Sequence, residues 1–336
     1  MNNKTKIYKF YGFIIKTAII VAAFWFIYRR LFVKDNLDDA LCSFQEKFKD
    51  PYFIKIILIV SLLMVINWGL ETFKWKYLIQ KIENVAYLKA LVAVLSGVTV
   101  SIFTPNRIGE YAGRVFILDK ADRWEGVLIT MLGSFSQLLI TIIAGSIGFI
   151  FFAKEYIDFS LNPEYFLYAL SLIIAILILI LIMLFYNISL LTNLINKLPG
   201  KLKKIRHYGS IFSYYSTREL TIVLFLSLTR YLVFMIQFFL LLNLFNSVIP
   251  FGEAIMMISM IYLVMAAIPT IALTELGIRS SVALYFIGLY FESHNPAAQN
   301  NLGIFTASSL LWLINLAIPS LLGAILIFKL KFFRKN

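Results

Sequence analysis

The chain has 336 residues, of which 60% are apolar and only 15% are charged. Soluble domains carry about 25% charged residues, so this composition excludes a soluble protein and indicates a polytopic membrane protein. The net charge of +13 would suggest nucleic-acid binding in a soluble protein, but in a membrane protein it first reports on topology. One cysteine, Cys42, and two histidines exclude an internal disulfide and a histidine- or cysteine-based metal site. We therefore expect no metal, no other cofactor and no nucleic-acid partner.

Long apolar runs divide the chain into membrane segments. Crossing the hydrocarbon takes about 20 apolar residues as helix, and the runs lack the strict alternation of barrel strands. The sequence therefore predicts an all-α, polytopic transmembrane helical bundle. The runs cover residues 13–33, 52–70, 87–103, 126–152, 163–186, 220–245, 251–291 and 302–328.

The stretches between the runs leave no room for a soluble catalytic domain. The longest of them, residues 187–219, is shorter than the roughly 50 residues that a self-standing domain needs. We therefore predict a single integral membrane domain over residues 1–336, with 187–219 as a basic cytoplasmic loop within it.

The distribution of lysine and arginine predicts the orientation, because these residues are enriched in cytoplasmic loops. The N-terminus, the 187–219 loop and the C-terminal tail are basic, so we expect both termini in the cytoplasm of a cell inner membrane. Both flanks of 87–115 then read as cytoplasmic, and both flanks of 251–291 read as external. The prediction is about six full spans plus two broken or re-entrant helical hairpins. The alternative is eight or nine plain spans with one loop that violates the charge rule.

The first predicted hairpin turns at the sequence Thr-Pro-Asn-Arg-Ile-Gly-Glu, residues 104–110. Thr104 and Pro105 form the predicted helix break, because proline lacks an amide donor, and Gly109 permits a tight backbone turn. Ionisable groups at membrane depth are costly and are functional candidates by default. This break is therefore a candidate site, and the alternative is an ordinary loop at the membrane interface.

The charged residues of this segment fit a phosphate group. Arg107 and Arg114 have forked donors that suit phosphate oxygens. Glu110 is the expected counter-ion, which holds one of the two arginines when no ligand is bound. We therefore predict that both arginines bind a lipid headgroup.

The second predicted hairpin breaks between Pro269 and Gly277 and has a similar set of charged residues. Arg279 is the expected headgroup-binding residue, and Glu275 is its counter-ion. The alternative is a simple pair, because an acid and an arginine at i,i+4 neutralise each other on a helix.

Arg230 lies ten residues into the run 220–245, about 15 Å along a helix and therefore near mid-membrane. It needs an acidic partner at that depth, and we expect Glu110 or Glu275 to supply it. If the helix begins near Leu224 instead, Arg230 is merely interfacial. We assign it to the headgroup-binding set.

Two other groups of polar residues have simpler interpretations. The segment 71–76, Glu-Thr-Phe-Lys-Trp-Lys, is typical of an interfacial belt, in which tryptophan lies among lysines. Asn67, Gln137 and Asn315 are interpreted as interhelical hydrogen bonds.

The motif at 104–110, the Glu-x-x-Lys-Trp-Lys patch before it and the late Leu-Gly-Ile-Arg at 276–279 resemble the lysylphosphatidylglycerol synthase transmembrane family of flippase-like membrane proteins. In relatives an acid usually follows the late arginine, whereas here Ser280 follows it and Glu275 precedes it. The resemblance implies the transporter-like membrane domain without the aminoacyl-transferase domain of the bifunctional members. It leaves the lipid open, because other relatives are linked to glycolipid and glycan pathways.

Three functions follow from these residues. The first is a transporter-like protein, not an enzyme, that handles or translocates an anionic lipid or a lipid-linked glycan intermediate across the bacterial inner membrane. Broken helices that meet near mid-membrane are how secondary transporters build sites, and the chain has no Walker-type loop for ATP. The second is a membrane-embedded transferase with a polyprenyl-phosphate donor, in which Glu110 would be the base. The third is a non-catalytic assembly partner of an envelope-lipid enzyme. The sequence does not predict an oligomeric state.

Overall fold

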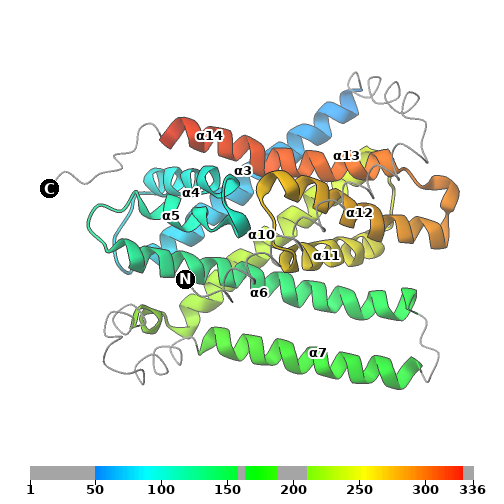
Figure 1. Ribbon diagram of the computed structural model, residues 1–336, viewed down its shortest axis with the longest axis horizontal. Helices are drawn as coiled ribbons and strands as arrows, with labels where there is room; N and C mark the ends of the chain where they lie inside the picture. The colour runs from blue at the N-terminus through cyan, green and yellow to red at the C-terminus, as the bar shows by residue number, and fades with distance from the viewer. Residues whose placement is uncertain (1–49, 158–162, 188–209, 328–336) are drawn as a thin grey trace, which may run out of the picture.

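The computed structural model describes residues 50–157, 163–187 and 210–327, and every regular element within these ranges is helical. The elements form an elongated bundle (Figure 1). Within the described ranges, five helices are long and apolar enough to cross a membrane: Pro51–Ile79 (α3), Arg123–Tyr156 (α6), Tyr165–Tyr186 in α7, Thr217–Leu244 (α10), and the segment Asn301–Leu326. The predicted run 13–33, most of the 187–219 loop and the C-terminal tail lie outside the described residues. A polytopic helical bundle is confirmed.

Polar side chains define where the long helices begin. Asp50 precedes Pro51, the first residue of α3, and its carboxylate accepts a hydrogen bond from the Tyr52 amide at 2.8 Å. Asp122 caps α6 in the same way, through the Trp124 amide at 2.7 Å. Such caps satisfy amides that have no partner within the helix. They fix the register of α3 and α6, on which two sides of the site lie.

The first predicted hairpin consists of two short helices, α4 (Tyr87–Ile102) and α5 (Gly109–Val115), joined by a 3-10 turn, η2 (Pro105–Arg107). At 16 residues α4 extends about 24 Å, less than the thickness of the hydrocarbon core. Helix α5 packs back along α4. A Cβ atom on Gly113 would lie 2.6 Å from the Cα atom of Gly97, so the absence of side chains at these positions permits the close approach. The chain therefore returns toward the end of the bundle at which α4 began.

The second predicted hairpin consists of α11 (Phe251–Ala267) and α12 (Ala272–His294). The interruption is confined to residues 268–271 and contains Pro269, as predicted. Thr274 closes the start of α12, since its hydroxyl accepts from the Ile271 amide at 3.2 Å. Gly277 corrects the prediction, because it lies inside α12 and not at the break. The proline alone interrupts the hydrogen-bonding pattern, and the helix resumes before the glycine is reached.

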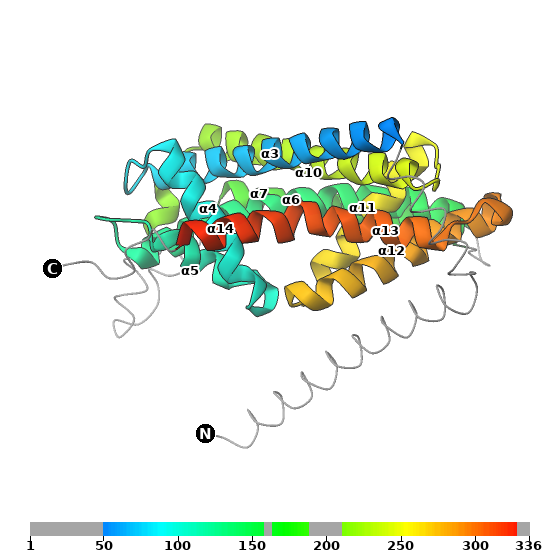
Figure 2. The ribbon, with the colours of Figure 1, turned by 90° about the horizontal axis from the view of Figure 1, so that it is seen from above.

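The two hairpins enter the bundle from opposite ends and meet near its middle (Figures 1 and 2). Their tips are joined directly, because the Asn106 amide donates to the Thr270 carbonyl at 2.9 Å. Asn106 and Arg107 have positive φ angles of 53° and 56°. Non-glycine residues in this region cost of order 1–3 kcal/mol each and are found where surrounding structure holds them. The tip contact is therefore a defined junction, which the local sequence alone does not favour.

The remaining elements complete the wall around this junction. Helix α13 (Asn301–Trp312) continues through a π-helical segment, η6 (Leu313–Ala317), into α14 (Ile318–Ile327). Such π segments occur often at functional sites. Helix α7 (Pro163–Tyr186) lies at the edge of the bundle beside α6. Two short 3-10 turns, η4 (Ser210–Tyr214) and η5 (Pro296–Ala298), precede α10 and α13.

Candidate functional site

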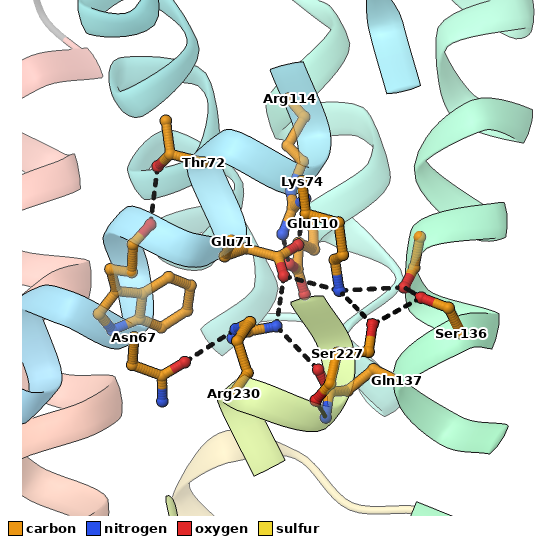
Figure 3. Close-up of polar contacts among 12 residues, drawn as sticks. Asn67, Glu71, Thr72, Lys74, Glu110, Arg114, Ser136, Gln137, Ser227 and Arg230 are labelled. Carbon is orange, nitrogen blue, oxygen red and sulfur yellow. Dashed lines mark hydrogen bonds and ion pairs between the residues drawn. The ribbon is translucent and has the colours of Figure 1, made fainter. Parts of the chain in front are cut away.

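A buried carboxylate on α3 organises the largest cluster of charged residues within the described part of the chain. Glu71 is 4% exposed and contacts three cations (Figure 3). Arg114 Nη1 donates to Glu71 Oε1 at 2.7 Å, Lys74 Nζ lies 2.9 Å from Oε2, and Arg230 Nη1 also donates to Oε2. These cations belong to α5, α3 and α10. Glu71 therefore joins the first hairpin to two long helices through charge-assisted hydrogen bonds.

Lys74 is 1% exposed, and polar groups surround its ammonium group. Besides Glu71, it donates to the Gly133 carbonyl at 3.2 Å and to the Ser227 hydroxyl at 3.3 Å. Ser227 is itself 2.8 Å from the hydroxyl of Ser136. A lysine is almost never fully buried unless it is paired, and these contacts supply the pairing on α3, α6 and α10.

Arg230 lies halfway along the 28 residues of α10 and is 7% exposed. Its Nε donates to Asn67 Oδ1 at 2.8 Å, and Nη1 also reaches Gln137 Oε1 at 3.3 Å. The guanidinium centre is 5.7 Å from the Trp68 ring centroid, within cation–π range. Because α10 begins at Thr217 and not near Leu224, the condition for the interfacial alternative is not met, and Arg230 lies midway along the helix.

The second charged cluster joins the two hairpin tips. Arg107 Nη2 donates to both carboxylate oxygens of Glu275, at 2.9 and 2.7 Å, and Arg279 Nη2 donates to Oε1 at 2.5 Å. Glu275 is buried, whereas the side chain of Arg107 is 39% exposed. The alternative of a self-contained Glu275–Arg279 pair is therefore wrong, because the acid is shared with the other hairpin.

A cavity connects the two clusters. One lobe has a volume of about 310 Å³ and is lined by Glu71, Lys74, Glu110 and Arg230 among others. A second lobe of about 690 Å³ is lined largely by apolar and aromatic side chains, including those of Tyr262, Met265 and Ile268. Both lobes share six lining residues: Arg107, Gln137, Thr141, Phe234, Glu275 and Arg279. The site therefore has two adjoining lobes, one richer in charged side chains and the other richer in apolar ones.

The structure brings most of the predicted site residues to this space. Arg107, Arg230, Arg279, Glu110 and Glu275 line it. The remaining predicted cation, Arg114, is 2% exposed and does not line either lobe, but it donates to Glu71 and Glu110, which line the charged lobe. The break residues Thr104, Pro105 and Gly109 shape the first tip: Thr104 Oγ1 accepts from the Gly109 amide at 2.8 Å.

Sequence reasoning missed Glu71 and Lys74 as site residues and named the wrong partner for Arg230. The partner is Glu71, not Glu110 or Glu275. The interfacial-belt interpretation of 71–76 is wrong for Glu71, Lys74 and Trp75, which are all buried. A signal was present, since Asn67, Glu71 and Lys74 are spaced i, i+4, i+7 and therefore share one helix face.

A separate polar contact fastens the loops at the end of the bundle where α4 begins. Glu83 accepts backbone hydrogen bonds from Asp119 at 3.1 Å, Lys120 at 2.8 Å and Ala121 at 2.9 Å. Partial burial opposes ionisation, but the three amides outweigh it and hold the pKa of Glu83 below its ordinary value of 4.5. The loop after α3 is thereby tied to the loop before α6.

Comparison with known proteins gives one match. Residues 13–299 match the family model described as the lysylphosphatidylglycerol synthase TM region. No curated protein and no solved structure matches the chain. The matched range includes both hairpins and all eight charged residues of the two clusters, and it confirms the resemblance that the motifs indicated. Together with the long apolar helices, the match identifies a multi-pass membrane protein of a lipid-related family.

Proposed function

The chain belongs to the lysylphosphatidylglycerol synthase TM region family, and we propose that it handles or translocates an anionic lipid, or a lipid-linked glycan intermediate, across the bacterial inner membrane. The observation that carries this proposal is the arginine-lined cavity where the two broken hairpins meet. Its charged lobe suits a phosphate headgroup, and its apolar lobe suits the hydrocarbon next to that headgroup. In this proposal both lobes are occupied by one amphiphile.

The glutamates are the counter-ions of the unliganded site. Glu275 pairs with both Arg107 and Arg279, and Glu110 pairs with Arg114. A phosphate group that reaches Arg107 competes with Glu275, because both present anionic oxygens to the same guanidinium fork. Arg107 is the most accessible of these cations. We therefore propose that it makes the first contact with the headgroup.

The same competition gives the hairpins a role in movement. The Arg107–Glu275 pair and the Asn106–Thr270 hydrogen bond link the two tips. When a phosphate replaces Glu275 at Arg107, one of these links is lost and the tips are freer to separate. Alternating access in transporters commonly uses such gating around a fixed central site.

The proposed orientation places the α4 end of the bundle in the cytoplasm, together with both termini. Lys81, Lys89, Lys120 and Arg123 lie in or beside the loops at that end. At the opposite end, the described loops 245–250 and 295–300 contain no lysine or arginine, and Lys55 and Lys154 lie in the helix ends beside it. This asymmetry is the one that positive-inside topology requires.

Translocation is tested directly with the full chain in proteoliposomes. Headgroup-labelled phosphatidylglycerol and a labelled polyprenyl phosphate are placed in both leaflets, and a membrane-impermeant quencher reports the exchange between leaflets. We expect quenching beyond the outer-leaflet half, at a rate that falls at least about tenfold in Arg107→Ala and Arg279→Ala, because each loses a charge-assisted contact of about 1.5–3 kcal/mol.

The matched control is Lys154→Gln, which removes one exposed positive charge far from the cavity. It should leave the rate unchanged. Equal rates in the parent protein and both arginine variants, with all proteins folded and inserted to the same extent, would contradict the proposed mechanism.

A further inference from the structure

The charges around the cavity do not cancel. The first cluster comprises Lys74, Arg114 and Arg230 against Glu71 and Glu110, and it has an excess of one positive charge. The second comprises Arg107 and Arg279 against Glu275, and it also has an excess of one. Each glutamate contacts at least one arginine, which favours its ionised form. The described site therefore has two uncompensated positive charges.

This excess is costly at membrane depth. The cations of the first cluster are all less than 10% exposed, and an unpaired buried charge costs several kcal/mol even after local relaxation. In the second cluster the excess faces the cavity through Arg107, whose side chain is 39% exposed. Among the described residues, no exposed acid lines either lobe. A ligand that enters with two negative charges removes the excess in both clusters. A ligand with one negative charge leaves one cation uncompensated, and a zwitterion leaves both.

Unpartnered polar atoms support a ligand rich in acceptors. Arg279 Nε and Trp312 Nε1 are buried donors that have no hydrogen-bond partner among the described residues. Both residues line the charged lobe. Buried donors normally have partners, and a small rotation of either side chain toward the charged lobe that it lines would bring its donor to an acceptor oxygen of a ligand there.

We infer that the site selects a lipid whose headgroup has two negative charges, as a phosphate monoester or a diphosphate does, over a singly charged phosphate diester. This inference rests on the proposed function and specifies its substrate class. A phosphate monoester has about two negative charges above its second pKa of about 6. The two excess positive charges match that charge, one from each cluster.

The test measures lipid binding to the purified full chain in an uncharged detergent at pH 7. Phosphatidic acid, phosphatidylglycerol and phosphatidylcholine with identical acyl chains provide two, one and no net negative charges. We expect phosphatidic acid to bind at least about tenfold more tightly than phosphatidylglycerol. Inorganic diphosphate is titrated in parallel, and binding of it as tight as that of phosphatidic acid would overturn a lipid as the source of the phosphate.

Charge variants make the test sharper in both directions. Arg279→Gln reduces the excess to one and should bring the preference for phosphatidic acid close to unity, whereas Glu110→Gln increases the excess and should widen the preference. Lys154→Gln removes a positive charge outside the cavity and should leave the preference for phosphatidic acid unchanged.

The outcomes separate this inference from the proposed function. Equal affinity for phosphatidic acid and phosphatidylglycerol, or the same preference in all four proteins, would overturn charge matching while leaving an anionic-lipid site intact. Absence of binding by both anionic lipids would overturn the proposed function itself.

Discussion

Replacing Glu71 with glutamine tests whether this residue is the electrostatic centre of the bundle. The substitution keeps the shape of the side chain. It removes the acid that, among the described residues, alone contacts Lys74 and that Arg114 and Arg230 share. The first cluster then has two uncompensated positive charges in place of one. All three cations are less than 10% exposed, so water cannot replace the carboxylate without reorganisation.

The size of the effect follows from this burial. Removal of one partner from a buried ion pair costs about 3–5 kcal/mol. With an unfolding entropy of about 2.1 cal/mol/K per residue, a chain of this length would lose about 4–7 °C in Tm. The measurement is thermal unfolding of the purified protein in detergent, followed by intrinsic tryptophan fluorescence.

Two variants determine the cause of any loss. Glu155→Gln removes an exposed acid near the end of α6 and should change Tm by less than about 1 °C. The double variant Glu71→Gln with Lys74→Met restores the original excess charge and should recover part of the loss. If Glu71→Gln is no more harmful than Glu155→Gln, or if the double variant is as unstable as the sum of the single ones, the electrostatic reasoning is refuted.

Three further perturbations address other parts of the account. Gly113→Ala should destabilise the protein by about 1–3 kcal/mol, because the new Cβ would lie 2.6 Å from the Cα of Gly97. The control for thermal unfolding is Gly252→Ala, whose new Cβ would have nothing within 4 Å. Equal Tm values for the two variants would contradict the packing argument. Glu83→Gln should cost about 1–3 kcal/mol at pH 7. The pKa of Glu83 is held below 4.5, so its contribution is present above that pH and is lost as pH falls through the folded-state pKa. The Tm difference between Glu83→Gln and the parent should therefore shrink in acid. A difference that is constant with pH would contradict a stabilising role of the ionised Glu83 carboxylate. Asn106→Gly should leave Tm unchanged or raise it, because glycine adopts the φ of 53° without steric cost; a clear loss of Tm would show that the asparagine side chain is needed at the tip.

The course of the chain was predictable because it depends on local properties. Hydropathy and length determine which segments suit a membrane, and both helix breaks contain a proline, which removes an amide donor wherever it occurs. Charge parity then predicted that residues 87–115 turn back. These signals act within a few residues, so the sequence contains them directly. The extent of α3 was less clear, because its last ten residues are polar enough to resemble an interface.

Which charged residues pair with one another in the site was not predictable in the same way. Arg230 and Glu71 are 159 positions apart, and nothing local in either segment specifies the other. Arg230 was correctly placed at depth but assigned to acids near known helix breaks. Glu71 was overlooked because its neighbours Trp75 and Lys76 imitate an interfacial belt. Only the packing of α3 against α10 separates a buried cluster from an exposed belt with the same residue types.

Mass spectrometry of lipids that remain bound to the purified protein tests the central claim most directly. Full-length protein is purified in an uncharged detergent, and its bound lipids are compared with those of the double variant Arg107→Ala with Arg279→Ala and of Lys154→Gln. A phosphate-bearing lipid should be enriched over its share of the membrane in the parent and in Lys154→Gln, and lost from the double variant. The same lipids in the same amounts in all three proteins would contradict the claim that the arginines of the cavity hold an anionic headgroup.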